Sequence, residues 1–338
     1  MKEFTRALPL LALPVFFAMA GGRSGAGPGE EDYSFEEGVK FLSEASRSWR
    51  AEHECVTCHT NGWGLAAQPV IAPGSKEVAA GRSFAQGYLL SFIEGQEQPS
   101  GQYGSVEGMV STAAFLALSD ARSGDEVHEA TRRGLDHAWA LLDESGTWDG
   151  WLQCNWPPFE SDAEYGPTLM LVALGELGDA AVLTSADRRA ARRLLDYLVK
   201  NEPMSLHAKA MRLWAASHWS GAVKAKRLRG WREELLAARA EDGGWSMAAL
   251  SGPAWKRDGG EPQVKASEAY PTAFIVYVLL QTGTPRTDEV IAEGLRWLRE
   301  HQRDGGDWFT RSPRRDGKHY ISRAATAFAL MALTEEEE

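Results

Sequence analysis

Two kinds of helical segment alternate along the sequence, and this alternation limits the chain to an architecture of helical hairpins. Segments of the first kind, such as residues 37–44 and 293–300, place apolar side chains at helical spacing and charges on the opposite face. Segments of the second kind are more apolar, and no apolar run alternates as a strand does. About five or six hairpins are expected, with the apolar helices in register at Thr112, Thr168, Lys209, Thr272 and Thr326.

Glycine–tryptophan turns follow several of the amphipathic segments. They end at Trp148, Trp245 and Trp308, and each has a glycine before the tryptophan. Glycine supplies a left-handed helix terminator, and the indole can pack back over the helix just ended. Apolar helices inside and amphipathic helices outside make a closed ring, with an open superhelical solenoid as the alternative. The repeat number and the alternation favour the ring.

The segment GLRWLREHQRDGGDW, residues 294–308, resembles the QW-type repeat of squalene-hopene cyclases. That repeat belongs to the wider terpene cyclase and protein prenyltransferase superfamily. The apolar segments YPTAFIVYVLLQTG and ATAFALMAL resemble the inner helices of the same family. The resemblance implies an all-α fold, a single α/α toroid over residues 33–334, with a hydrophobic central cavity. Full-length hopene cyclases have two such barrels, and the length of this chain allows one.

The N-terminal segment has the pattern of a secretory signal peptide over residues 1–20. Lys2 and Arg6 precede an apolar run of about 14 residues, which is too short to span a bilayer, and Ala18-Met19-Ala20 is a small-x-small cleavage pattern. A flexible segment is expected over residues 21–32, and residues 335–338 are an acidic tail. The mature protein is therefore expected to be exported to the periplasm or another extracytoplasmic space, soluble, with no transmembrane segment.

The net charge of −11 excludes the electrostatic footprint of a phosphate-binding or nucleic-acid-binding protein. The basic residues are scattered apart from short helical clusters. The sequence also lacks a Gly-x-Ser-x-Gly nucleophile turn, a Walker-type loop, a dinucleotide glycine motif and an HExxH motif. No nucleic-acid partner is expected.

The loop at residues 53–60 contains Cys55-x-x-Cys58-His59, the attachment signature of a c-type haem. The two thiols would form thioethers with the haem vinyl groups, and His59 would be the axial ligand of the haem iron. A Cys55–Cys58 disulfide, with Cys154 left over, and a zinc site are the alternatives; zinc is disfavoured because no second cysteine pair exists. Haem attachment takes place outside the cytoplasm, so the signal peptide favours one covalent haem c set into the first repeat.

Three carboxylates precede an apolar segment, at Glu160, Asp162 and Glu164. In hopene-type cyclases an acidic DxDD motif protonates the isoprenoid, so the resemblance makes these residues candidate catalytic acids, although the adjacent Asp-Asp pair is missing here. Carboxylates close together in an apolar mouth can hold one proton with a raised pKa. The alternative is a helix cap by Ser161 or Asp162, with the other acids complementing the helix dipole.

These features together predict an exported haem-c protein on a cyclase-like toroid, acting in electron transfer or redox chemistry. A redox partner protein and an apolar, isoprenoid-like ligand are its expected partners. The first alternative is a terpene or squalene cyclase-like lyase or isomerase that uses Glu160, Asp162 and Glu164. The second alternative is a non-catalytic repeat module that binds a partner through one face of the ring.

Overall fold

The computed structural model describes residues 33–96, 105–151, 156–180, 183–220 and 223–334. In these ranges the regular structure is helical, apart from one isolated bridge between Ser246 and Ser267. Two short helices complete the loops, the π-helical turn η2 (Cys58–Gly62) and α10 (Met247–Leu250). The outer helices are α1 (Phe35–His53), α3 (Lys76–Ile93), α5 (Glu129–Leu141), α7 (Ser185–Lys200), α9 (Ala225–Ala237) and α12 (Glu289–Glu300). The inner helices are α2 (Trp63–Ile71), α4 (Val106–Ser123), α6 (Tyr165–Ala180), α8 (Leu206–His218), α11 (Ala269–Gln281) and α13 (Ile321–Leu333).

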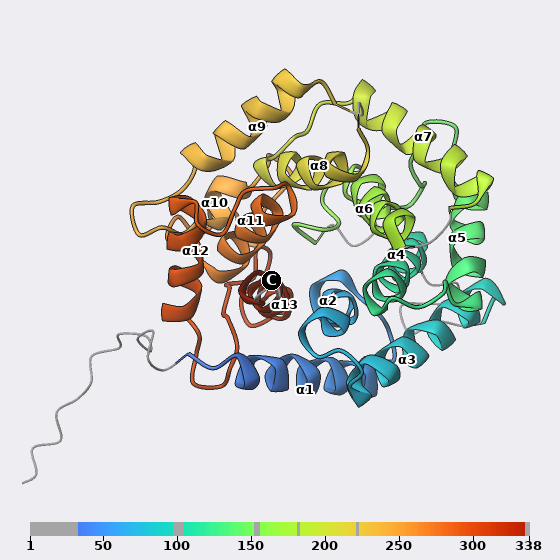
Figure 1. The fold of residues 1–338 in the computed structure, drawn as a ribbon, viewed down its shortest axis with the longest axis horizontal. Helices are drawn as coiled ribbons and strands as arrows, with labels where there is room; N and C mark the ends of the chain where they lie inside the picture. The colour runs from blue at the N-terminus through green and yellow to red at the C-terminus, as the bar shows by residue number, and fades with distance from the viewer. Residues whose placement is uncertain (1–32, 97–104, 152–155, 181–182, 221–222, 335–338) are drawn as a thin grey trace, which may run out of the picture.

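The twelve long helices form a closed ring of six hairpins (Figure 1). Each inner helix packs against the next, from α2 through α4, α6, α8, α11 and α13, and α13 packs against α2 again. The chain therefore returns to its starting point, which an open solenoid does not do. The predicted all-α fold, a single α/α toroid, is confirmed.

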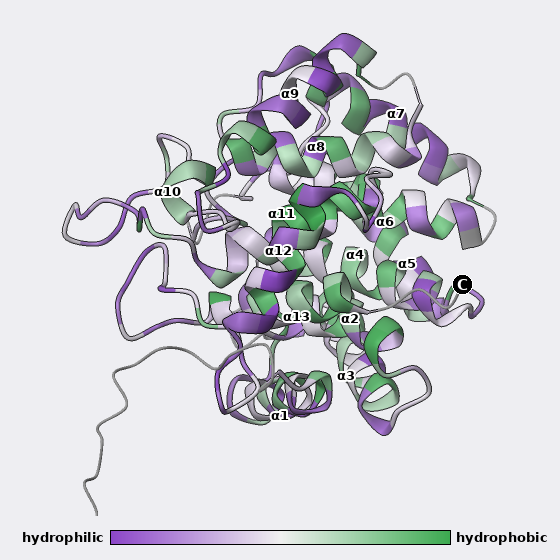
Figure 2. Cartoon of the chain, turned by 60° about the vertical axis from the view of Figure 1, so that its left-hand side comes forward, coloured by the Kyte–Doolittle hydropathy of each residue, from purple (hydrophilic) through white to green (hydrophobic). Residues whose placement is uncertain are grey.

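The hydrophobicity of each helix matches its place in the ring (Figure 2). Inner helix α11 is buried over nearly all of its length, whereas outer helix α12 buries one stripe and exposes the charged face opposite. A helix that is apolar all round needs neighbours on every side, and an amphipathic helix needs them on one side only. The two kinds of segment in the sequence thus sort themselves into inner and outer rings.

The glycine–tryptophan turns repeat one geometry in three hairpins. Each indole nitrogen donates to the carbonyl of the residue ten positions earlier, at 2.7 to 2.9 Å, in the pairs Trp148–Ala138, Trp245–Leu235 and Trp308–Leu298. The predicted packing of tryptophan over the preceding helix is confirmed. The glycines do not end the helices as expected, because they lie in the turn that follows, with positive φ, at Gly146, Gly243 and Gly306.

Aromatic side chains fill the centre of the ring. Trp63 of α2 lies with its ring centroid 4.5 Å from Phe328 of α13 and 5.9 Å from Trp214 of α8, and all three side chains are buried. The resemblance implied a hydrophobic central cavity here, but at the level of Trp63 these rings occupy the axis. Trp63, Trp214 and Phe328 thus form an aromatic plug in the ring. The plug separates the side where the inner helices begin from the side where they end.

The expected signal peptide, the segment 21–32, the acidic tail 335–338 and Cys154 lie outside the described residues. Among the helices that are described, none has the length and apolar character needed to cross a membrane.

Candidate functional site

Buried polar side chains gather where the inner helices begin. They come from η2 and the first turns of α4, α6, α8 and α11, and from the loop that leads into α6. The positive ends of the helix dipoles meet at this end of the ring, which favours negative charge.

The Cys-x-x-Cys-His loop forms one wall of this site. It connects α1 to α2 and turns into η2, in which Cys58 is fully buried and His59 is 6% exposed. Asn61 holds the turn, because its side chain accepts from the Thr57 backbone nitrogen and donates to the Cys55 carbonyl. The loop therefore has a compact conformation supported by its own hydrogen bonds.

Glu107 and Glu160 form a buried carboxyl pair at the centre of the site. They are 5% and 3% exposed and are joined by a side-chain hydrogen bond. Burial raises the pKa of Glu107, and hydrogen bonds from Glu160, Ser105 and Cys58 oppose the rise. The Cys58 thiol donates to Glu107 Oε1 over 3.8 Å. Two carboxyl groups in contact repel each other when both are ionised, which favours one shared proton in the resting site.

His59 lies beside this pair in its neutral form. Its Nε2 is 3.2 Å from the carbonyl oxygen of Trp156, which can only accept, so Nε2 carries the proton. Nδ1 is then a lone pair, and it faces Glu160 Oε1 at 3.6 Å. Burial lowers the pKa of His59 to about 4, which keeps the ring uncharged at neutral pH. This arrangement favours the protonated form of Glu160 and the ionised form of Glu107.

A second polar layer lies on the far side of Phe159. His207 Nε2 and the Tyr270 hydroxyl are 2.9 Å apart, and both side chains are buried. The hydroxyl of Tyr165 lies against the indole nitrogen of Trp63. Burial raises the pKa of Tyr165 well above its usual value. Phe159 packs between the two layers, with ring centroids 5.0 Å from His59 and 5.7 Å from Tyr270.

Two half-exposed aromatic rings lie beside the site, on the His59 side. Trp156 lies 5.8 Å from the His59 ring and 6.3 Å from the Tyr320 ring, and both aromatic residues are partly accessible. The guanidinium of Arg314 lies 5.3 Å above the Trp156 ring. Aromatic faces beside a few polar groups are typical of sites for small organic ligands.

The three predicted acids have three different environments. Only Glu160 belongs to the buried pair. Asp162 caps α6, since its Oδ1 accepts from the backbone nitrogens of Glu164 and Tyr165 at 3.1 and 3.0 Å, as the cap alternative expected. Glu164 forms a buried ion pair with Arg212 at 2.6 Å and also accepts from a backbone nitrogen. The structure therefore places Asp162 and Glu164 in the support of α6 rather than against the carboxyl pair.

Sequence reasoning did not identify Glu107, Tyr165, His207 or Tyr270 as one group. They are far apart in the chain, but each lies two to five residues before a register residue of an inner helix. First-turn positions of all inner helices face the same end of a toroid. Aligning the repeats on the register residues and searching those positions for polar side chains would have found them.

The same geometry bears on the expected haem. An iron ligand at His59 needs Nε2, which here binds the Trp156 carbonyl, and a thioether at Cys58 needs a sulfur that here is buried against Glu107. The residues as placed do not fit a haem, and attachment would require both contacts to be released. No cluster of three or more His, Cys, Asp or Glu residues suited to a metal occurs in the described part of the chain. Covalent haem attachment stays a prediction.

Comparisons with known proteins relate the chain to others by fold. No family model and no curated protein sequence matches it. A family 88 glycosyl hydrolase from Bacteroides vulgatus has a similar solved structure, with a TM-score of 0.55 at 9% identity, covering 88% of this chain and 98% of the other. An unsaturated glucuronyl hydrolase from Bacillus sp. GL1 gives 0.52 at 14% identity, covering 89% and 96%. A polysaccharide lyase gives 0.51 at 10% identity, covering 88% and 96%. The shared fold is the α/α toroid.

The expected redox function is wrong. The three similar solved structures named above, which cover 88–89% of this chain, are glycosyl hydrolases and a polysaccharide lyase. The residues expected to hold the redox cofactor are instead packed into the wall of a carboxyl site. The cyclase alternative, which required Glu160, Asp162 and Glu164 to act together, loses its basis because the fold separates them.

Proposed function

We propose that this protein is a carbohydrate-processing enzyme that cleaves a glycosidic bond by acid catalysis at the N-terminal end of its inner ring. The observation that carries the proposal is the buried Glu107–Glu160 pair beside the neutral imidazole of His59, in which burial raises the pKa of Glu107. An acid that keeps its proton near neutral pH is what protonation of a leaving-group oxygen needs.

The carboxyl pair acts as one protonating unit. Two carboxyl groups that flank a glycosidic bond are about 5 Å or more apart, whereas these two are in hydrogen-bond contact. Glu160 donates the shared proton to the departing oxygen as the C–O bond breaks, so the charge of the pair goes from one negative to two. The positive charge that develops on the sugar ring compensates the second negative charge. Water then adds to the sugar carbon and returns a proton to the pair. His59 has its own proton committed to the Trp156 carbonyl, so its Nδ1 lone pair faces Glu160 and favours the protonated carboxyl.

The comparisons support a carbohydrate substrate at the level of architecture. The named hydrolases and the lyase use the same toroid, and the half-exposed rings of Trp156 and Tyr320 offer flat apolar faces to a sugar ring. Residues 294–308 resemble the squalene-hopene cyclase repeat. We assign that resemblance to the shared toroid fold and not to a shared reaction.

The proposal is tested by assaying the purified protein on a panel of oligosaccharides and polysaccharides, with reducing ends and unsaturated products measured separately. Glu107→Gln and Glu160→Gln should each lower the cleavage rate by at least about 100-fold, the usual contribution of a general acid. Glu44→Gln, an exposed acid on α1, is the matched control and should retain full activity.

Release of unsaturated products would identify the enzyme as a lyase rather than a hydrolase. Full activity in both glutamine variants would refute the assigned site, and no cleavage of any glycan would refute the function.

A visible spectrum of protein made with haem-maturation machinery tests the separate haem prediction, because thioether-bound haem survives denaturation.

A further inference from the structure

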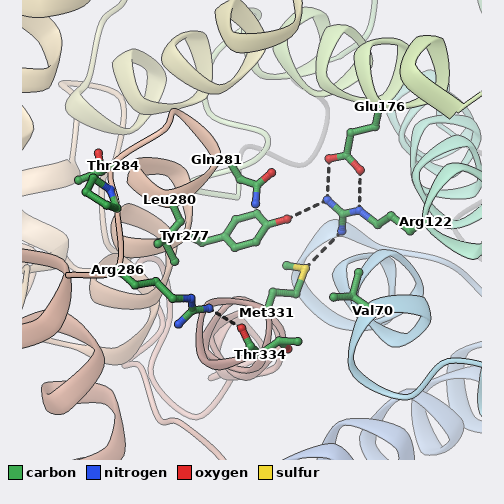
Figure 3. A pocket seen from close by; sticks show the side chains of 11 residues that line it. Val70, Arg122, Glu176, Tyr277, Leu280, Gln281, Thr284, Arg286, Met331 and Thr334 are labelled. Carbon is green, nitrogen blue, oxygen red and sulfur yellow. Dashed lines mark hydrogen bonds and ion pairs between the residues drawn. The ribbon is translucent and has the colours of Figure 1, made fainter. Parts of the chain in front are cut away.

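A second pocket lies at the opposite end of the ring, where the inner helices finish. Its volume is about 350 Å³, at the lower end of the range for small-ligand sites (Figure 3). Inner helices α2, α4, α6, α11 and α13 and the loop after α11 supply its walls. The aromatic plug at Trp63 separates it from the carboxyl site.

One wall is a partly buried ion pair that carries no net charge. Arg122 donates to both carboxylate oxygens of Glu176, at 2.6 and 2.7 Å, and also to the Tyr277 hydroxyl, the Ala66 carbonyl and the sulfur of Met331. The guanidinium thus has a partner in every direction. Each Glu176 oxygen accepts one of these bonds and keeps a second lone pair for a donor.

Other polar groups that line the pocket keep hydrogen-bonding capacity of both kinds. The Tyr277 hydroxyl accepts from Arg122 and retains its own hydrogen to donate. The exposed amide of Gln281 has no drawn partner, and it can both donate and accept (Figure 3). Thr284 accepts from Arg232 through its hydroxyl, which can still donate. Arg286 binds the carbonyls of Ala332 and Thr334 through one nitrogen, and its other nitrogens can donate.

Each charged side chain of the pocket has a partner that offsets its charge wholly or in part. Arg122 is neutralised by Glu176, and Arg286 faces the C-terminal carbonyls of α13, which carry the negative end of that helix dipole. Val70, Leu280 and Met331 add apolar surface between the polar groups. An anion would gain attraction from Arg286 alone, because Arg122 is already paired with Glu176, and a purely apolar ligand would leave the Tyr277 hydroxyl without a partner for its hydrogen.

We propose that this pocket is a second, non-catalytic binding site for a neutral, hydroxyl-rich ring such as a monosaccharide. Each hydroxyl of such a ligand can both donate and accept a hydrogen bond. The polar groups that line the pocket include donors and acceptors close together, so they can pair with such hydroxyls. The C–H face of the ring covers the apolar part of the wall. The inference stands on the lining of this pocket and does not require the carboxyl site to be catalytic.

Titration calorimetry and saturation-transfer NMR with D-glucose test the proposal on the full chain. We expect a dissociation constant of the order of 1 mM, as for a small ligand with a few hydrogen bonds. Gln281→Trp fills the mouth of the pocket without removing any contact of the fold, and should weaken binding at least about tenfold. Tyr277→Phe removes one hydroxyl and should weaken it about threefold.

Two controls distinguish this pocket from the rest of the surface. Glu44→Trp introduces the same ring at an exposed position of α1 and should leave glucose binding unchanged. Glu107→Gln, at the other end of the ring, should leave it unchanged as well. Absence of glucose binding, tighter binding of acetate or glycine than of glucose, or glucose binding that survives Gln281→Trp would each overturn the inference. Loss of binding in Glu107→Gln would place the sugar at the carboxyl site instead.

Discussion

Glu160, Asp162 and Glu164 are neighbours in sequence, but the fold gives each a different partner. Glu160 meets a carboxyl group from another repeat, Asp162 meets the backbone of its own helix, and Glu164 meets Arg212 of α8. A sequence pattern shows that acids are dense, and only the three-dimensional partner decides which of them holds a proton. Cap formation at Asp162 was predictable because it is local; the pairing of Glu160 was not.

Cys58 tunes the carboxyl pair through its thiol. The thiol donates to Glu107 and lowers the pKa of that carboxyl, so Cys58→Ala should raise the pKa of Glu107. The alkaline limb of the pH–rate profile, where the shared proton is lost, should then move to higher pH. Cys58→Ser keeps a donor and should restore the limb toward its original position. If the alanine and serine profiles coincide, the thiol has no electrostatic role in the site.

His207 links the stability of the fold to pH. Burial lowers the pKa of His207 to about 3, while the unfolded chain takes up a proton near pH 6.5. Between these values the unfolded state binds more protons, so stability falls as the pH falls, by about 1.4 kcal/mol per pH unit for one histidine. His207→Phe should remove this slope between pH 6.5 and pH 5 in urea titrations, and the exposed His301→Gln is the control.

The difference between variant and wild type is the quantity to compare in that experiment. Burial raises the pKa of Asp162 and Glu268 to about 7, so their contribution to stability has the opposite pH dependence over the same interval. The stability of the wild type can therefore be nearly independent of pH over this interval even though the pKa of His207 is lowered in the folded state. An unchanged slope in His207→Phe would show that the imidazole is protonated in the folded state.

At the scale of elements, each glycine–tryptophan turn packs against the outer helix of the next hairpin. The glycine at positive φ brings the turn against that helix, so that a Cβ on Gly306 would lie 2.3 Å from the Glu37 carbonyl oxygen. A Cβ on Gly146 would lie 2.5 Å from the corresponding carbonyl of Arg193. Close approach, as well as backbone conformation, therefore explains the residue type at these turns.

Gly306→Ala should destabilise the protein by more than about 2 kcal/mol, because the left-handed conformation and the contact with Glu37 both oppose a Cβ. Gly259→Ala is the matched control: Gly259 also has positive φ, but nothing lies within 4 Å of the added carbon. It should lose only about 1 kcal/mol. Chemical denaturation measures both variants, and equal losses would mean that the contact with α1 is not important.

Helix types, their order and their turns were predictable because helical periodicity and glycine conformation are local properties. The site was less accessible from sequence, since Glu107 and Glu160 are 53 positions apart and meet only when α4 packs against α6. The Cys-x-x-Cys-His motif is the reverse case, in which a clear sequence pattern does not describe the local conformation. Its pattern is specific to a chemistry, but Asn61 and the Trp156 carbonyl fold it into a turn that the pattern does not describe.

For the whole molecule, the decisive contact is the one that joins the first repeat to the last. Gln302, after α12, accepts from the Ser34 backbone nitrogen at 2.7 Å and donates to the carbonyls of Ser34 and Gly306 at 2.8 and 3.0 Å. Its side chain is 2% exposed. The glutamine of the QW-type repeat therefore also fastens the two ends of the chain, beside the packing of α13 against α2.

Gln302→Ala should lower the free energy of unfolding by about 2 kcal/mol or more, because three hydrogen bonds are lost and two backbone groups are left without a partner. The effect should reach the whole ring. In a closed toroid each repeat has two neighbours, so hydrogen exchange under global-unfolding conditions should accelerate in α6 as much as in α1. Gln281→Ala, at an exposed position of α11, is the control and should change neither quantity. Acceleration confined to α1 and α12 would show that the repeats unfold one by one, as in an open solenoid, and that ring closure adds nothing to the cooperativity of the fold.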